Sequence, residues 1–452
     1  MHLPGRWVVL AGSFLLTATS AASAQGDGPN LDVELRGDSY FEAGSSETDA
    51  PRGQGWLILE PRYATHASPR IVFSVRAVLE TDTHGDISRD HIFDEEDREL
   101  LRSPLRFEQL SFMFDLGAVD IEAGRQMLSW GRTDGVRPTD NLTPRDWTDP
   151  LEEERLPPWA VRANLEKGRW SGEAAVVARY APSRLPVLGG RWFPAGPDSA
   201  ANPLYPAVGP KTLELTYEWE EAVFPPTTLA NSQYGVKGGY RGERAEWTLS
   251  FYRGFDDSPR VAATPGIPQL NAGVQPVIFT RRFPRLNVAG GDVVVLAASW
   301  AFRGEAGYFH YTEGLDDGYL LYEAEAEWTR GNWSAILGYA DVAGADLTGD
   351  LFTEPDAAPG QSAGASSSLD QVFLPAAFLH LARVVPTEWE ASLEAAVGVK
   401  EGDSLVRVSG SWPFNDHVRV GGELDILSGP QGTLFGRWRA NDRLRLFLRL
   451  SF

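Results

Sequence analysis

The residues best suited to chemistry are charged side chains between Arg125 and Asp149. The arginines and aspartates concerned are Arg125, Arg132, Arg145, Asp134, Asp140, Asp146 and Asp149. A planar guanidinium group binds a carboxylate through two parallel hydrogen bonds, so such pairs can hold irregular backbone in place. Two interpretations follow. Either the segment folds inward as a constriction that filters solutes by charge, or it is a structural anchor packed against a wall by Trp130 and Trp147.

Two further sets of charges alternate with other residues, as they would on one face of a strand. The acidic set is Glu323, Glu325, Glu327, Glu388, Glu390 and Glu394, and the basic set is Arg407, Arg419, Arg443, Arg445 and Arg449. If both sets line a lumen, the facing acidic and basic walls would create a transverse field that orients a polar solute. The alternative is a wide, wet lumen in which the charges neutralise one another.

Enzymatic chemistry has little support in the sequence. Acyl transfer needs a serine activated by a base, and the chain has no Gly-x-Ser-x-Gly elbow. Ser334 with His380 is a candidate by residue type only. We therefore expect no enzyme, no catalytic residue and no cofactor, and a barrel hydrolase remains an alternative.

Metal binding is not predicted either. The histidines show neither an HExxH motif nor paired spacing, which argues against a zinc site. The acidic stretch from Asp82 to Glu99 could offer oxygen ligands to Ca²⁺, but its spacing matches no EF-hand loop. A solvated run of charges is the preferred interpretation of that stretch.

The element that would position these charges is visible in the last ten residues, Arg443–Phe452. Leucines alternate there with arginines, and successive side chains of a strand point to opposite faces, so one face is apolar and the other charged. A closing strand that ends in an aromatic residue resembles the last strand of Gram-negative outer-membrane β-barrels. That resemblance implies that Phe452 is an assembly signal read by the barrel-assembly machinery.

Similar alternating segments recur along the chain. We count roughly eighteen of about ten residues each, with sixteen as the runner-up, and predict an all-β, closed antiparallel transmembrane β-barrel. Tight turns are expected at Gly117, Lys167-Gly168, Gly242-Glu243, Arg303-Gly304 and Gly331. These turns would be periplasmic, and the long extracellular loops would fold partly into the lumen. The longest loop, Tyr180–Ser232, is expected to lie over or in the pore.

The start of the chain and its composition fit this class. Residues 1–24 have the pattern of a signal peptide, with Arg6, the apolar run Trp7–Thr17 and the cleavage motif Ala22-Ser23-Ala24. No linker or shift in composition divides residues 25–452, so they would form a single domain. No long apolar run predicts a transmembrane helix, so a membrane domain of this chain would have to be a barrel. The formal net charge of −21 argues against a nucleic-acid partner, and the absence of cysteine excludes thiol chemistry. Fifteen Trp and thirteen Tyr suit the aromatic girdles of a membrane barrel.

Three stretches carry a resemblance to a family. They are Gly124-Arg125-Gln126 with Trp130-Gly131 and the loop beyond, Phe283-Pro284-Arg285 with Ala289-Gly290-Gly291-Asp292, and Phe435-Gly436 with Asn441-Asp442-Arg443. The chain here resembles outer-membrane barrels described as porin-like or alginate-export-like. The resemblance implies a transport or export channel.

The sequence as a whole therefore predicts a channel in the outer membrane of a Gram-negative bacterium. It would pass polar or weakly amphipathic solutes, or an exported polymer. Its expected partners are outer-membrane lipid, the barrel-assembly machinery, and a periplasmic or inner-membrane transport partner. A plugged structural or adhesive barrel without conductance is the second alternative, since a barrel can be filled by its own loops.

Overall fold

A computed structural model of the chain describes residues 28–42, 51–88, 102–152, 154–193, 199–312, 318–344, 374–430 and 433–452. The predicted signal peptide, residues 1–24, lies outside the described residues. No helix among the described residues is long and apolar enough to cross a membrane.

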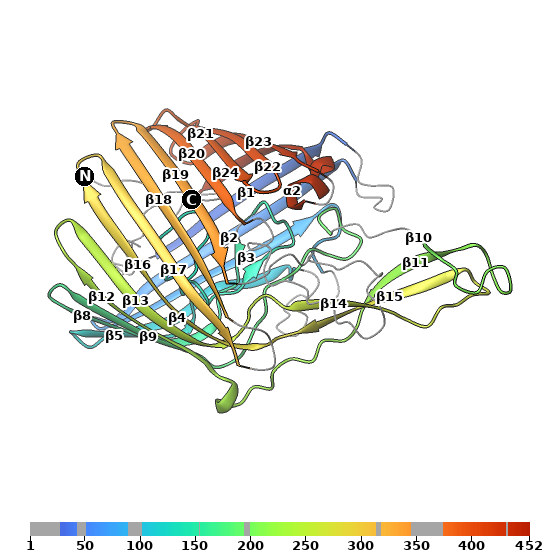
Figure 1. Cartoon of the computed structure of the whole chain (residues 1–452). Helices are drawn as coiled ribbons and strands as arrows, with labels where there is room; N and C mark the ends of the chain where they lie inside the picture. Colours follow the sequence, from blue (N-terminus) through green and yellow to red (C-terminus); the bar gives the residue numbers. More distant parts are fainter. Residues whose placement is uncertain are drawn as a thin grey trace.

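Eighteen strands form one closed antiparallel barrel (Figure 1), so the predicted fold class and strand count are confirmed. The barrel strands are β1 (Gly28–Tyr40), β2 (Gly53–Ser68), β3 (Ile71–Asp82), β4 (Leu105–Asp115), β5 (Val119–Arg125), β8 (Trp159–Lys167), β9 (Trp170–Val177), β12 (Gln233–Arg241), β13 (Ala245–Phe255), β16 (Arg285–Ala297), β17 (Trp300–Tyr311), β18 (Tyr319–Arg330), β19 (Trp333–Ala343), β20 (Ala376–Val385), β21 (Trp389–Gly398), β22 (Ser404–Pro413), β23 (Val418–Ser428) and β24 (Arg443–Ser451). Each pairs with its neighbours in chain order, and β24 closes the ring on β1. Closure leaves no strand edge unpaired, as a membrane requires.

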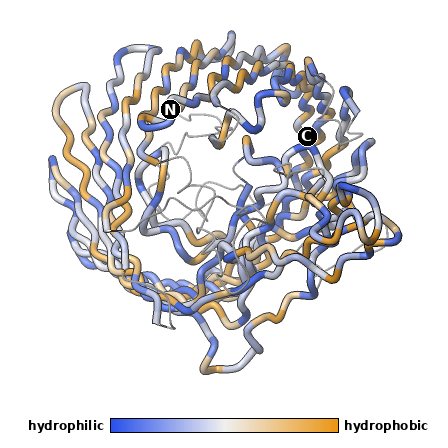
Figure 2. The backbone as a smooth tube through the Cα atoms, turned by 45° about the vertical axis from the view of Figure 1, so that its right-hand side comes forward, coloured by the Kyte–Doolittle hydropathy of each residue, from blue (hydrophilic) through white to orange (hydrophobic). Residues whose placement is uncertain are grey.

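Hydrophobic and hydrophilic residues alternate along the strands (Figure 2). Successive side chains of a strand point to opposite faces, so the barrel has an apolar exterior and a charged interior. On β24, Leu444 and Leu446 are 38% and 59% exposed, whereas Arg443 and Arg445 are buried. Exposed tryptophans gather near the ends of strands that are joined by tight turns: Trp170, Trp247, Trp300, Trp333, Trp389 and Trp412. An exposed apolar band with such an aromatic girdle is what a barrel presents to lipid.

The hairpin between β16 and β17 differs from the prediction. Its turn is at Ala298-Ser299, whereas Arg303 and Gly304, the predicted turn, lie in the middle of β17. Ala298 has a positive φ of 54°, which a residue other than glycine adopts only occasionally, so the turn had no sequence signal. The shift moves Arg303 and Glu305 from a turn region onto the inner wall.

The tight turns and the long connections lie at opposite ends of the barrel. Because the strands alternate in direction, the turns at Gly117, Gly168, Gly242 and Gly331 must share one end. At the other end, β10 (Ser199–Ala201), β11 (Thr212–Trp219), β14 (Arg260–Pro265) and β15 (Val274–Arg282) form a separate four-stranded sheet. Figure 1 shows this projecting sheet extending away from the barrel.

The connection Tyr180–Ser232 has two parts that lie in different places. The expectation that it lies over or in the pore is right for only one of them. Arg191 and Trp192 are buried against the barrel interior, where they contact Asn441 and Trp438. Its strands β10 and β11 belong to the projecting sheet instead. The short helical elements are η2 (Leu229–Asn231), α2 (Leu434–Arg437) and η3 (Arg439–Asn441), and the last two lie in the connection before β24.

Candidate functional site

Residues 126–158, here called the inner loop, fold into the barrel between β5 and β8. Its side chains are among the most deeply buried of the described residues, with Leu128 and Thr133 fully buried and Trp130 2% exposed. The strands β6 (Arg145–Asp146) and β7 (Glu154–Arg155) pair within it. The inner loop contains most of the charged residues that the sequence singled out first.

One side of the inner loop is held by carboxylates of β17 and β18, here called the acidic wall: Glu305, Glu323 and Glu325. Glu305 accepts hydrogen bonds from the backbone N–H groups of Arg132, Thr133 and Thr139 at 2.7, 3.3 and 2.8 Å, and from both threonine hydroxyls. Its neighbours on β18 do the same: Gly135 N–H donates to Glu323 at 3.0 Å, Val136 N–H also donates to Glu323, and Asp134 N–H donates to Glu325 at 3.0 Å. The acidic wall thus binds backbone, and its acceptors satisfy amides that would otherwise be buried without partners.

Glycines in the wall let the loop approach closely. Gly290 of β16 and Gly307 of β17 are direct partners in the ladder. A Cβ on Gly290 would lie 2.8 Å from the Thr139 methyl group, and one on Gly307 would lie 2.8 Å from the Pro138 carbonyl oxygen. The pair therefore forms the flat surface on which residues 138–139 rest.

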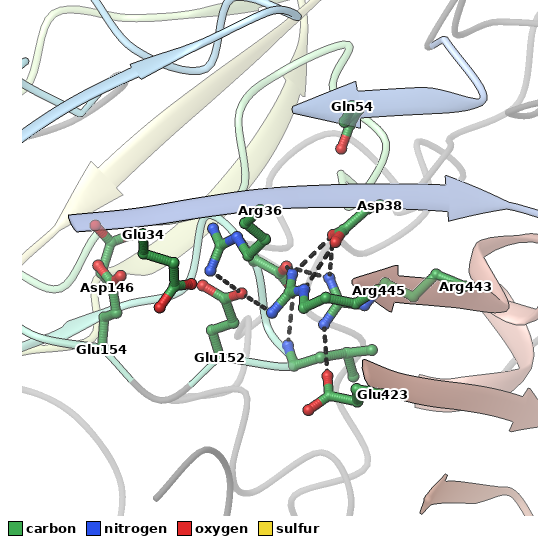
Figure 3. Close-up of polar contacts among 12 residues, drawn as sticks. Glu34, Arg36, Asp38, Gln54, Asp146, Glu152, Glu154, Glu423, Arg443 and Arg445 are labelled. Atoms are coloured by element: carbon green, nitrogen blue, oxygen red, sulfur yellow. Dashed lines mark hydrogen bonds and ion pairs between the residues drawn. The ribbon is translucent and has the colours of Figure 1, made fainter. Parts of the chain in front are cut away.

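The opposite side of the inner loop meets Arg36 of β1, Arg407 of β22, and Arg443 and Arg445 of β24, here called the arginine wall (Figure 3). Glu152 is held by Arg36 at 2.8 Å and also by Arg445. Asp149 forms an ion pair with Arg443, and the Leu151 carbonyl oxygen accepts a hydrogen bond from Arg407 at 3.3 Å.

The arginine wall is itself balanced by acidic residues of neighbouring strands. Asp38 on β1 accepts from Arg445 at 2.7 and 2.8 Å, and Asp425 on β23 accepts from Arg443 at 2.6 Å and from Arg407. The pairing of β24 with β1 places Arg449 opposite Glu34 as well. Asp32 pairs with Arg62 of β2.

Electrostatics within the inner loop follow from the same arginines. Asp146 lies between Arg102, at 3.2 Å, and Arg184, at 2.9 Å. Burial acts to raise the pKa of Asp146, but the two guanidinium groups outweigh it and hold that pKa below its usual range. Burial likewise opposes ionisation of Glu152, and its arginine partners hold its pKa well below the usual range. Both carboxylates stay charged at neutral pH.

The charged side chains predicted between Arg125 and Asp149 lie in the same loop, but their ion-pair partners lie outside that segment. Asp134 contacts Arg303 of β17 at 3.3 Å, and Arg132 contacts Glu246 of β13 at 2.9 Å and Asp292 of β16 at 3.1 Å. Asp140 pairs with Arg155 further along the loop. Arg145 packs over the Trp147 ring at 5.4 Å, and Arg125 ends β5 beside Trp159 in the ladder.

The remaining predicted residues are spread over the wall. Glu327 contacts Arg303, so the acidic residues of β18 are neutralised in part by one arginine. Glu390 accepts from Arg419 at 3.0 Å and from Ser411 at 2.7 Å. Glu388 was wrongly assigned to a strand face: it is exposed in the turn before β21, which begins at Trp389.

Several residues of the site escaped the sequence analysis. Arg303 and Glu305 were missed because the hairpin was placed in the wrong register. Arg36, Arg102 and Glu152 carry no motif, and only their inward parity on strands or their place in a long loop could have drawn attention to them. Their partners come from segments more than 40 residues away in sequence, so local patterns could not pair them.

Cavities lie on two sides of the inner loop. The larger, about 160 Å³, lies against β18–β22 and combines aromatic residues such as Phe378 and Trp438 with the carboxylates of Glu323 and Glu394. The smaller, about 40 Å³, lies on the side of β16–β18 and is lined by Tyr252, Asp256 and others. A mixed apolar and acidic lining suits a solute with an apolar body and a hydrogen-bond donor.

The serine–histidine pair considered for catalysis is not arranged as a nucleophile and its base. Ser334 is the ladder partner of Ala382, and His380 is the partner of Ile336, so the two residues sit on adjacent strands two positions apart. His380 contacts Glu394 at 3.3 Å. No hydrogen bond joins Ser334 to His380 in the described part of the chain.

Phe452 continues the pairing of the closing strand with the first. Its N–H donates to the Leu31 carbonyl at 2.9 Å, and its own carbonyl accepts from Leu31 N–H at 3.1 Å. The ring is 65% exposed and stacks on His417 with centroids 6.4 Å apart. An exposed aromatic at the turn end is consistent with the girdle described above.

These features define the class of protein: a transmembrane β-barrel with a loop folded into its lumen. No protein-family model and no curated protein matches the chain. The eighteen-stranded barrel that the alternating segments predicted is confirmed by the strand pairing.

Solved structures with a similar chain path are outer-membrane proteins. OccAB4 of Acinetobacter baumannii is 10% identical, with a TM-score of 0.49 over 95% of this chain and 99% of that chain. OccK3 (OpdO) of Pseudomonas aeruginosa is 11% identical, with a TM-score of 0.48 over 94% and 95% of the two chains. Wzi of Escherichia coli, described as a carbohydrate-binding β-barrel involved in group 1 capsule assembly, is 10% identical, with a TM-score of 0.47 over 95% and 85%. At these identities the likeness concerns the fold alone.

Proposed function

We propose that this protein is an outer-membrane channel of a Gram-negative bacterium that passes small polar or weakly amphipathic solutes. The observation that carries the proposal is the inner loop, which is held across the barrel by polar bonds to both walls. A loop held in this way narrows a lumen while leaving charged and hydrogen-bonding groups along it, which is how channels select solutes.

The size of the space beside the inner loop favours a small solute. The larger cavity, about 160 Å³, is below the roughly 300–1,000 Å³ of typical ligand pockets. An exported polymer would therefore need the inner loop to leave its site, at the cost of many buried hydrogen bonds. A small solute needs only local side-chain movement.

A plugged barrel is the second candidate, and one observation favours it. The inner loop is bound on two opposite sides, so its docking is firm enough to seal a lumen. The closed exterior and the paired Phe452 fit either function, because both require assembly in the outer membrane.

Conductance in planar bilayers separates the candidates. Wild-type protein and a variant with residues 131–138 replaced by a short Gly-Ser linker would be compared, since the wall ladder does not include those residues. An open wild type with a larger step in the variant supports the small-solute channel. A sealed wild type that opens in the variant supports a plugged barrel, and two sealed proteins would reject a pore through this lumen.

A further inference from the structure

A group of possible metal ligands lies at the rim of the barrel, where Asp86 lines a small cavity together with Thr148, Asp149 and Glu152 of the inner loop. Asp82 ends β3, and His84 and Asp86 follow it at alternate positions. One ligand atom from each lies within 4.8 Å of those of the other two. The His84 Nε2 atom is 3.0 Å from an Asp86 carboxylate oxygen and 3.4 Å from an Asp82 carboxylate oxygen.

These separations fit a bound cation. Zinc binds imidazole nitrogen and carboxylate oxygen at about 2.0–2.2 Å, so neighbouring ligand atoms of a tetrahedral site lie roughly 3.3 Å apart. Both observed nitrogen–oxygen distances are close to that value. The three side chains would need little rearrangement to face one ion.

The surrounding residues hold the His84 ring in place but provide no arginine or lysine partner for the carboxylates of Asp82 and Asp86 in the described part of the chain. The His84 side chain is 2% exposed, and its ring packs edge-on against Trp56 with centroids 4.7 Å apart. Its Nδ1 atom has no hydrogen-bond partner, and neither aspartate forms an ion pair with an arginine or lysine in the described part of the chain. Elsewhere at this end of the barrel, buried acids such as Asp146 are paired with arginines.

The position also restrains the backbone that carries the ligands. Thr83 exchanges backbone and side-chain hydrogen bonds with Gly55 of β2, and Asp86 N–H donates to the Asp82 carboxylate at 2.6 Å. Residues 82–86 are thus folded back so that alternate side chains converge. The spacing Asp-x-His-x-Asp is visible in the sequence, and the bends at residues 83–85, with Gly85 at a positive φ of 94°, bring the three side chains together.

We propose that Asp82, His84 and Asp86 bind one divalent cation of the zinc class at the loop end of the barrel. One imidazole and two carboxylates favour such a cation over Ca²⁺, which prefers six or more oxygen ligands. Water would complete the coordination, and the bound ion would hold the start of the connection after β3 against Trp56. This site is independent of the proposed channel function.

The test is a Zn²⁺ titration of the mature protein in detergent, made without a polyhistidine tag and first treated with a chelator. Isothermal titration calorimetry should show one site, and His84→Ala should weaken binding by about tenfold or more. Asp86→Asn should weaken it as well, and it keeps the proposal testable should His84→Ala fail to fold. The control is His310→Ala, which removes an exposed histidine of β17.

Spectroscopy and competition sharpen the outcome. Electron paramagnetic resonance of bound Cu²⁺ should show one nitrogen donor in the wild type and in His310→Ala, and none in His84→Ala. Heat-modifiable migration on gels checks that each variant is folded. The proposal is overturned by a folded wild type that binds no Zn²⁺, by equal affinity of wild type and His84→Ala, or by displacement of Zn²⁺ at equimolar Ca²⁺.

Discussion

The acidic wall and the arginine wall hold the same inner loop by different means. The acidic wall binds main-chain amides, so Glu305 and Glu323 recognise the path of the backbone. The arginine wall binds mainly side chains, so Arg443 and Arg445 recognise the identities of Asp149 and Glu152. The acidic wall therefore fixes the backbone path of the inner loop, and the arginine wall requires acidic side chains at particular positions of it.

The difference separates two roles within one constriction. Bonds to backbone amides persist through most loop substitutions, because every residue except proline offers an N–H group. Bonds to acidic side chains disappear when those side chains change, and they leave unpaired arginines facing the lumen. We infer that the acidic wall sets the width of the passage and the arginine wall sets its charge.

The largest effect is expected from Glu305→Ala. Three backbone N–H groups and the Thr139 hydroxyl lose their acceptor, and each such group left buried without a partner costs roughly 1–3 kcal/mol. The Thr133 hydroxyl keeps the Val136 carbonyl as its acceptor. The inner loop should detach from the acidic wall and single-channel conductance should rise several-fold. Glu390→Ala is the matched control, since Glu390 contacts Ser411 and Arg419. Equal conductance in both variants would show that the acidic wall does not set the width.

A change of selectivity, with a smaller change of conductance, is expected from Asp149→Asn combined with Glu152→Gln. The replacements keep the shapes but leave Arg36, Arg443 and Arg445 with less opposing charge, so permeation should shift toward anions. Reversal potentials in a salt gradient measure the shift. Glu218→Gln on exposed β11 serves as control, and a shift toward cations would refute the assigned role of the arginine wall.

A pH effect is expected beside the inner loop, at Asp256. Burial, followed by the nearby Asp257, raises the pKa of Asp256 from 3.8 to about 7, against the lowering effects of Tyr311, Ser258 and Arg260. A raised carboxyl pKa means that the stabilisation is fully present below about pH 3.8, decreases as pH rises toward 7, and does not change further above pH 7. Residues 255–258 should therefore become less protected between about pH 4 and pH 7.

Hydrogen exchange of that segment, corrected for intrinsic rates, measures this loss of protection. Asp256→Asn should remove most of the pH dependence because its amide cannot ionise. Asp416→Asn, in the exposed turn before β23, should behave like the wild type. Protection that increases toward pH 7 in the wild type would contradict the sign of the effect.

The smallest effect is expected from shortening the connection between β10 and β11, residues 203–209. The projecting sheet has its own apolar cluster of Leu215, Val261, Val277 and Phe279. It lies away from the barrel in Figure 1, so conductance should not change. A several-fold rise would restore the expectation that this part of Tyr180–Ser232 narrows the pore.

The barrel could be predicted from local sequence patterns alone. Alternation of leucine with arginine in Arg443–Phe452 already specifies which face is apolar, because a strand has a period of two. Turn glycines such as Gly117 and Gly331, both with positive φ in the structure, marked where strands end. The misplaced β16–β17 turn shows the limit, since Ala298-Ser299 contains no glycine, whereas Gly304 lies within a strand.

Which charged side chains pair with one another depends on the tertiary structure. The sequence placed arginines and aspartates together between Arg125 and Asp149, and it suggested that they pair with one another. The structure pairs Arg132 with Asp292 and Asp149 with Arg443 instead, across the barrel. Charge pairing depends on distance in space, and closure of the barrel, which joins β24 to β1, brings together residues hundreds of positions apart. The period of a strand is local and can be read from the chain, whereas the partners of a charge exist only after the ring has closed.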